Sequence, residues 1–188
     1  MPETNANDEV VALRKIIEIS GLLNSTLDLD ELLQKIMASA ADVLAAETSS
    51  LFLVDETSGD LNITTATGES GEQVTRRQVP AHQGIAGWVV DNGEAAVVES
   101  PQDDPRFYAV MDKAIQFETR NMVAVPLKVR DETIGVVEVI NKREGSFSET
   151  DAELAQALTN QAAIAIDNAR LYARLADAVV SSRMSYRL

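Results

Sequence analysis

Residues 133–142 read Thr-Ile-Gly-Val-Val-Glu-Val-Ile-Asn-Lys, and this stretch decides the fold. Valine and isoleucine dominate it, which is typical of a strand buried in a sheet. Residues 122–129 have a similar composition, and only Arg130-Asp131-Glu132 separates the two segments. The pattern therefore predicts a β-hairpin. Pro126 has no N–H to donate, so we expect its strand to be irregular or to lie at an edge there.

Strands and helices also precede this hairpin. Short runs of alternating or β-branched residues, separated by turn-prone segments, predict further strands; apolar residues at helical spacing predict helices, one of them ending before Gly93. Polar loops are expected at 68–73 and 100–105. The predicted strands are residues 49–55, 61–67, 76–79 and 97–98, and the predicted helices are residues 8–24, 28–46, 84–92 and 108–114.

A long helix is expected to close the sequence. Ser148 to Asp151 form a capped start, and no proline or glycine follows. About 30 helical residues extend roughly 45 Å, which is more than a domain of this size needs for packing. The distal part, with Leu171, Leu175 and Val179, is therefore expected to need a partner helix. The whole order predicts an α+β domain with an antiparallel sheet.

Composition excludes several classes of function. The chain has 188 residues, a formal charge of −14, no cysteine and one histidine. Excess negative charge opposes binding to nucleic acid or to anionic membrane surfaces, so neither partner is expected. Without cysteine there is no disulfide, thiolate nucleophile or thiolate-bound metal. No apolar run reaches the roughly 20 residues that cross a bilayer, and no export signal is visible, so a cytoplasmic protein is expected.

The catalytic motifs that we sought are also missing. The sequence has no phosphate-binding loop of the Gly-x-x-x-x-Gly-Lys type, no His-Glu-x-x-His and no Gly-x-Ser-x-Gly. His82, the only histidine, is expected in a loop, and no metal site is expected. Trp88 is expected to be a core residue. The chain is therefore predicted not to be an enzyme.

Four segments in order resemble a GAF domain: residues 50–55, 84–87, 120–127 and 134–142. The resemblance covers about residues 28–172. It implies an antiparallel sheet of about six strands, with helices on one face and a ligand pocket on the other. It also divides the chain into an N-terminal tail and dimerisation or linker helix (1–27), the GAF sensor domain (28–172) and a C-terminal extension of the linker helix (173–188).

Within that family, the chain resembles the regulatory GAF domains of cyclic-nucleotide phosphodiesterases and adenylyl cyclases, and also bacterial GAF sensors. Their signature is matched by Asn141, Lys142, Phe147 and Asp151, although Ala152 intervenes before Glu153. In that family the lysine and the aspartate form an ion pair that shapes the pocket region without holding the nucleotide.

The resemblance also assigns the ligand-binding positions. Ile85 and Ala86 match the helix start whose N–H groups meet a cyclic phosphate, as unpaired donors at a helix N-terminus can. Ile115 departs from the family, because a hydroxyl residue is expected there. The other matching positions carry an aromatic, a strand hydroxyl, two groups near the base and a carboxylate: Tyr108, Ser50, Asp112, Thr119 and Glu138.

Two functions remain open at this stage. In the first, the domain senses a small molecule, with cAMP or cGMP as the candidate regulatory ligand and no other cofactor. It then signals through paired helices of a homodimer to an output domain, where one follows Leu188; whether one does is left open. In the second, the pocket is vestigial and the domain serves dimerisation. Glu138 interrupts an apolar strand, so it contacts a ligand, joins an internal ion pair or faces outward.

Overall fold

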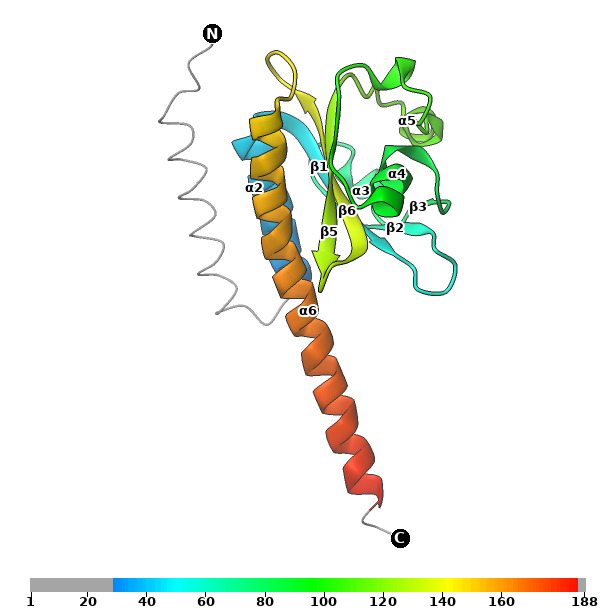
Figure 1. Ribbon diagram of the computed structural model, residues 1–188, viewed down its shortest axis with the longest axis vertical. Helices are drawn as coiled ribbons and strands as arrows, with labels where there is room; N and C mark the ends of the chain where they lie inside the picture. The colour runs from blue at the N-terminus through cyan, green and yellow to red at the C-terminus, as the bar shows by residue number, and fades with distance from the viewer. Residues whose placement is uncertain (1–28, 186–188) are drawn as a thin grey trace.

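The computed structural model describes residues 29–185, with side chains described through Arg174. At its centre is a six-stranded sheet in the order β3-β2-β1-β6-β5-β4, in which every neighbouring pair is antiparallel (Figure 1). This architecture confirms the predicted α+β, GAF-like fold. The strands are β1 (Ala46–Val54), β2 (Leu61–Ala66), β3 (Gln78–Val79), β4 (Ala96–Val98), β5 (Met122–Val129) and β6 (Glu132–Lys142).

The deciding stretch forms β6, which pairs with β1 along one edge and with β5 along the other. Its alternate residues face opposite sides of the sheet. Val137 and Val139 belong to one hydrophobic core, whereas Val136 belongs to the other. The valine-rich composition therefore reflects burial on both faces, and Glu138 lies on the same face as Val136.

Two long helices cover one face of the sheet. These are α2 (Leu29–Val43) and α6 (Glu149–Ser185), which lie side by side in Figure 1 and enclose the first core. The expected extension of α2 to about residue 46 is wrong. Ala45 adopts a positive φ of 51°, which ends the helix, and β1 begins at the next residue.

The opposite face carries three short helices and the second core. They are α3 (Gly71–Val74), α4 (Gly84–Asn92) and α5 (Val110–Ile115). The predicted helix 84–92 is confirmed, and Gly93 caps it in the left-handed conformation with φ 65°. The loops expected at 68–73 and 100–105 instead contain α3 and a 3-10 turn, Pro101–Asp103.

Two details at the edges of the sheet can be compared with the predictions, and one differs from its prediction while the other matches. The strand predicted at 76–79 is only Gln78–Val79, because Arg76 takes a φ of 72° and turns the chain. Pro126 lies beyond the part of β5 that pairs with β4, and its carbonyl accepts a hydrogen bond from the Gln156 side chain at 2.9 Å. Pro126, which has no N–H to donate, therefore lies where β5 has no paired residue of β4 beside it, so it is at an edge of the sheet, as predicted.

Helix α6 continues well beyond the sheet (Figure 1). Its 37 residues extend about 55 Å. Ile164, Leu171 and Tyr172 are exposed on it, while its N-terminal half packs on β5 and α2. The predicted helix 8–24 and the side chains of Leu175 and Val179 lie outside the described residues. No described helix is both long and apolar enough to cross a membrane.

Gly135 offers a test of the packing between β1 and β6. A Cβ atom at this position would overlap the backbone carbonyl oxygen of Phe52. Gly135→Ala should therefore lower the free energy of unfolding by about 2 to 3 kcal/mol, as overpacking in a core does. Urea denaturation measures the change. Thr133→Ala, two residues away and partly exposed, is the control and should change stability by less than about 0.5 kcal/mol; equal effects would contradict the packing.

Candidate functional site

A pocket lies between the sheet and the short helices of the second face. Its volume, counted as space open to the centres of water molecules, is about 90 Å³. One water needs about 10 to 15 Å³ of such space, so the pocket has room for about six to nine waters or one compact organic ligand. Most of the lining is apolar: Phe52, Ile63, Val74, Val79, Ile85, Ala86, Phe107, Met111, Ile115, Phe117, Met122 and Ile140.

Ser50 and Glu138 form the polar floor of this pocket. They are directly opposite each other in the register of β1 and β6, and both line the pocket. Among the described residues, neither the Ser50 hydroxyl nor the Glu138 carboxyl has a hydrogen-bond partner. Thr48, two residues before Ser50, also faces the pocket, but its hydroxyl donates to the Thr67 carbonyl. Alternate residues of a strand face the same side of the sheet, so the position of Thr48 two residues before Ser50 could have identified it from the sequence.

Glu138 is partly accessible, and the space that it borders is the pocket. Burial, with a smaller contribution from the nearby Asp112 carboxylate, raises the pKa of Glu138 to about 8. At pH 7 the protonated form then exceeds the ionised form by roughly ten to one. The pocket therefore presents a neutral carboxylic acid, which both donates and accepts hydrogen bonds.

Asp112 and Thr119 are brought together, but they bind each other. The Thr119 N–H and hydroxyl donate to the two carboxylate oxygens of Asp112, each at 2.8 Å. Gln102, which sequence reasoning missed, donates weakly to Asp112 and to the Thr119 carbonyl, at 3.4 Å each. No residue of α5 is fully buried, so these hydrogen bonds add to the packing of Met111 and Ile115 on the second core in holding α5 over the pocket.

Helix α4 brings its N-terminus to the pocket. Gln83 precedes it without a side-chain cap, and the first backbone hydrogen bond back to Gln83 comes from Gly87 at 3.0 Å. Within the described part of the chain, the N–H groups of Gly84, Ile85 and Ala86 have no acceptor. A Cβ on Gly84 would lie 3.1 Å from the Cβ of Tyr108, so this glycine lets the predicted pocket aromatic approach the helix start.

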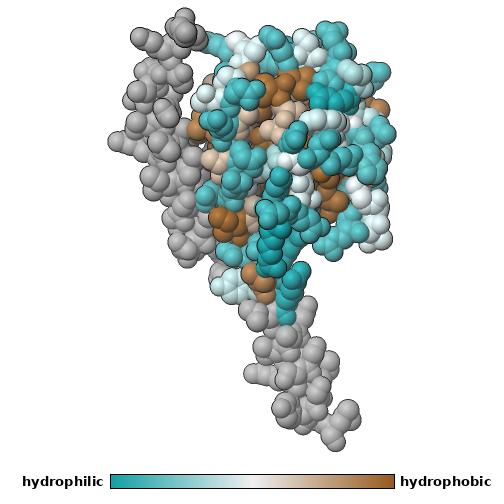
Figure 2. Space-filling model, in the orientation of Figure 1, coloured by the Kyte–Doolittle hydropathy of each residue, from teal (hydrophilic) through white to brown (hydrophobic). Residues whose placement is uncertain are grey.

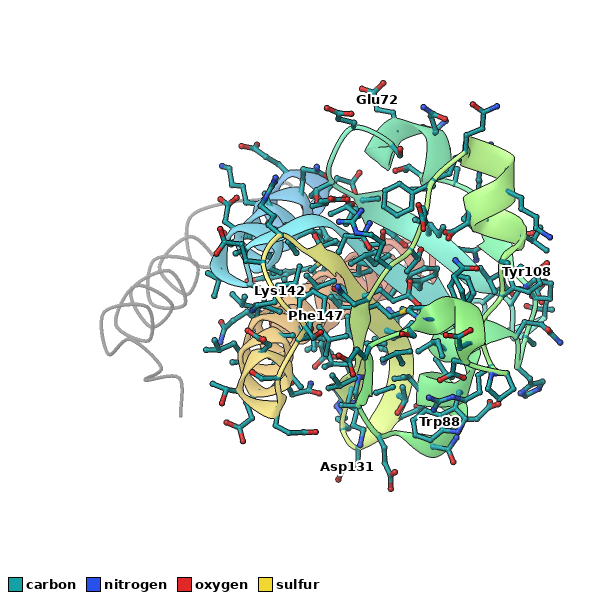
Figure 3. All side chains as sticks on the ribbon, turned by 90° about the horizontal axis from the view of Figure 1, so that it is seen from above. Glu72, Trp88, Tyr108, Asp131, Lys142 and Phe147 are labelled. Atoms are coloured by element: carbon teal, nitrogen blue, oxygen red, sulfur yellow. The ribbon has the colours of Figure 1, made fainter. Side chains whose placement is uncertain are left out.

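The signature residues lie on the other face. The Lys142 ammonium contacts both Asp151 oxygens at 2.8 Å and lies 5.5 Å from the centre of the Phe147 ring. Figure 3 shows Lys142 and Phe147 together near α2 and α6, with Tyr108 and Trp88 across the sheet. Asp151 also accepts from the Ser148 N–H at 2.8 Å and so caps α6. The ion pair thus joins the end of β6 to the start of α6.

Asn141 forms a structural junction. Its side chain accepts from the Arg120 N–H at 2.8 Å and donates to Glu47 and to the Glu118 carbonyl at 2.9 Å. Burial would raise the pKa of Glu47, but hydrogen bonds from Arg120 and Asn141 outweigh it, so the pKa is lowered. Sequence reasoning missed the pairing of Glu47 with Arg120, because 73 residues separate the two positions.

Of the remaining candidates, His82 and Trp88 lie outside the pocket lining. His82 is an exposed loop residue paired with Asp91 at 2.8 Å. Trp88 is partly buried against the second core, and the Arg106 guanidinium lies 4.7 Å from its ring centre. Ile115 borders the pocket and keeps it apolar there. The described part of the chain contains no group of three acidic, histidine or cysteine side chains placed to hold a metal ion.

The profile of the GAF domain matches residues 28–166. The chain belongs to the GAF family. The same fold occurs in the GAF domain of a phosphoenolpyruvate-protein phosphotransferase from Coxiella burnetii, with a TM-score of 0.79 and 20% identity over 91% of this chain and 99% of that one. The fold and the family resemblance of the sequence are therefore confirmed.

Two phosphodiesterases are similar in sequence. The probable 3',5'-cyclic phosphodiesterase pde-5 of Caenorhabditis elegans is 27% identical over 176 residues, covering 89% of this chain and 24% of the enzyme. The dual 3',5'-cyclic-AMP and -GMP phosphodiesterase 11A of Takifugu rubripes is 31% identical over 172 residues, covering 84% of this chain and 19% of the enzyme. The chain thus spans about a quarter or less of either enzyme and is related to their regulatory GAF domains.

The raised pKa of Glu138 should make the free energy of unfolding of the GAF domain depend on pH. An acid with a pKa raised by folding holds its proton more tightly in the folded state, so stability falls as pH rises from the unfolded pKa to the folded one. The free energy of unfolding should fall by up to about 1.4 kcal/mol per pH unit between about 4.5 and about 8. Glu138→Gln should remove this component of the pH dependence.

Urea denaturation from pH 5 to pH 8.5 measures the difference between the two proteins. Glu132→Gln is the matched control, because Glu132 is an exposed residue of the same strand. Its profile should follow the wild type. Parallel profiles for the wild type and Glu138→Gln would contradict the buried neutral acid.

Proposed function

We propose that this GAF domain is the sensory module of a cytoplasmic signalling protein and binds a cyclic nucleotide, cAMP or cGMP. One observation carries the proposal. Unpaired N–H groups at the start of α4 and the unpaired polar side chains of Ser50 and Glu138 line one apolar pocket. A helix N-terminus suits a phosphate, and a polar floor within apolar walls suits a heterocyclic base.

The charges in the pocket are compatible with an anionic ligand. Among the residues that the structure describes, Asp112 and Glu138 are the acidic members of the lining, and it includes no lysine, arginine or histidine. Asp112 is clamped by Thr119, and Glu138 is mostly protonated at neutral pH. The positive end of the α4 dipole is therefore what supports a cyclic phosphate, and no basic side chain is required.

The output proceeds through β6 and α6 in this proposal. Glu138 and Lys142 lie four residues apart on β6, and Lys142 binds Asp151 in the first turn of α6. A ligand that binds two arrangements of this segment with different affinity shifts their populations. The shift then reaches an output domain attached beyond α6, through helices paired in a homodimer.

Isothermal titration calorimetry with cAMP and with cGMP tests the ligand. The wild type should bind at least one, and Ser50→Ala should weaken binding about fivefold, as the loss of one hydrogen bond worth about 1 kcal/mol does. Glu138→Leu should weaken it more while the protein stays folded, because leucine suits the apolar surroundings. Glu132→Gln should bind like the wild type. Unchanged affinity in both pocket variants would contradict the assignment.

The second candidate function is dimerisation alone, and the exposed apolar residues of α6 favour it. Leu171 and Tyr172 are exposed on the part of α6 that extends from the domain. Figure 2 shows apolar patches among a largely hydrophilic surface on one face of the described residues. Homodimer contacts along α6 would bury such residues.

Leu171→Lys should convert a dimer to a monomer in light scattering after size exclusion, because a charge would be buried at the contact. Lys128→Ala, at an exposed position of β5, is the control and should leave the dimer intact. Under the sensory proposal the monomeric variant keeps its nucleotide affinity. A wild type that is dimeric but binds no nucleotide would favour the second candidate. A monomeric wild type would contradict both the paired helices of the sensory proposal and the dimerisation of the second candidate.

A further inference from the structure

Within the described part of the chain, the Glu138 carboxyl group has no hydrogen-bond partner. The structure describes no side chain that donates to it, and the lining of its pocket includes no cationic residue. Its surroundings can be followed element by element. From β1 it faces the neutral hydroxyl of Ser50, and its β5 partner is Ala124. From α4 the lining is Gly84, Ile85 and Ala86, so α4 adds no titratable group to it.

The segment over the pocket adds the remaining titratable groups. Asp112 comes from α5 and Tyr108 from the turn that precedes it. Both oxygens of Asp112 already accept hydrogen bonds from Thr119. Each Asp112 oxygen therefore already has a donor, whereas no described group donates to the Glu138 oxygens. Two ionised carboxylates in one apolar pocket would repel each other, so the geometry assigns the proton to Glu138.

We propose that Glu138 binds the ligand as a neutral acid, and that the pocket thereby selects a ring edge on which a hydrogen-bond donor stands beside an acceptor. The inference rests on the proposed nucleotide function and adds to it the recognised edge and a coupled proton. Ser50, the direct neighbour on β1, supplies a hydroxyl that can adjust to either role.

The protonation state decides which edge fits. A neutral acid offers one O–H donor and one C=O acceptor, whereas an ionised carboxylate offers acceptors only. The adenine edge carries an amino donor at N6 and an acceptor at N1, which matches the neutral acid. The guanine edge carries two adjacent donors, N1–H and the N2 amino group, which matches the carboxylate. Ionisation of Glu138 should therefore penalise cAMP more than cGMP.

Calorimetric titration of the full chain with cAMP and cGMP at pH 6.5 and pH 9 tests the coupling. Neither the adenine ring nor the cyclic phosphate titrates in this range. With a pKa of about 8 for Glu138, cAMP affinity should fall about tenfold between the two pH values. The affinity for cGMP should show no fall of this size, because the guanine edge matches the ionised carboxylate. Glu138→Gln, whose amide keeps a donor and an acceptor at every pH, should bind cAMP with no such fall, and Glu132→Gln should follow the wild type.

A second measurement examines the proton without a nucleotide. The ¹³C NMR signal of the Glu138 carboxyl, assigned by its loss in Glu138→Gln, should titrate with a midpoint near pH 8 in the ligand-free protein. A midpoint below about pH 6 overturns the inference. So does a cAMP affinity that has the same pH dependence in the wild type and in Glu138→Gln. If the carboxyl titrates near pH 8 and neither nucleotide binds, the nucleotide function is overturned while the protonated pocket is supported.

Discussion

The pairing of β6 along both of its edges is the constraint on which the rest of the molecule depends. Because β1 and β5 fix its register, each residue of β6 has one possible face. Val137 and Val139 anchor the core under α2 and α6, and Val136 and Glu138 face the pocket. A shift by one residue would put the carboxyl into the apolar core beneath the helices, so the core itself holds Glu138 in the pocket.

Burying a carboxyl without a partner costs free energy, and the structure limits the cost by leaving the group protonated. Elsewhere the domain pairs the polar groups that it buries. Asn141 is fully buried yet bonded on all sides, and Lys142 meets Asp151. The contrast distinguishes a group that stabilises the fold from one that faces the pocket. Stabilising contacts are complete within the protein, whereas Ser50 and Glu138 are left with free hydrogen-bonding capacity.

The sequence predicted the elements far better than their ends or their contacts. The β-branched stretches predicted the strands because burial on both faces requires them. The shortened β3 and the early end of α2 depend on single residues, Arg76 and Ala45, in left-handed conformations that no pattern indicates. In the site, the resemblance identified residues that do meet at one pocket. It did not reveal that Asp112 and Thr119 bind each other, because that depends on how α5 folds back over seven residues.

One face of the sheet lines the pocket and the other packs against α2 and α6, and β6 contributes residues to both. Its Glu138 faces the pocket, and four residues later its Lys142 holds the start of α6. Any movement of β6 relative to α6 must break or bend a contact of 2.8 Å between charged groups that are mostly buried. Such a contact is stiff, because removing either partner leaves a charge poorly solvated. Under the sensory proposal, motion at the pocket therefore reaches α6 as a displacement of its first turn, and the long helix extends that displacement away from the sheet.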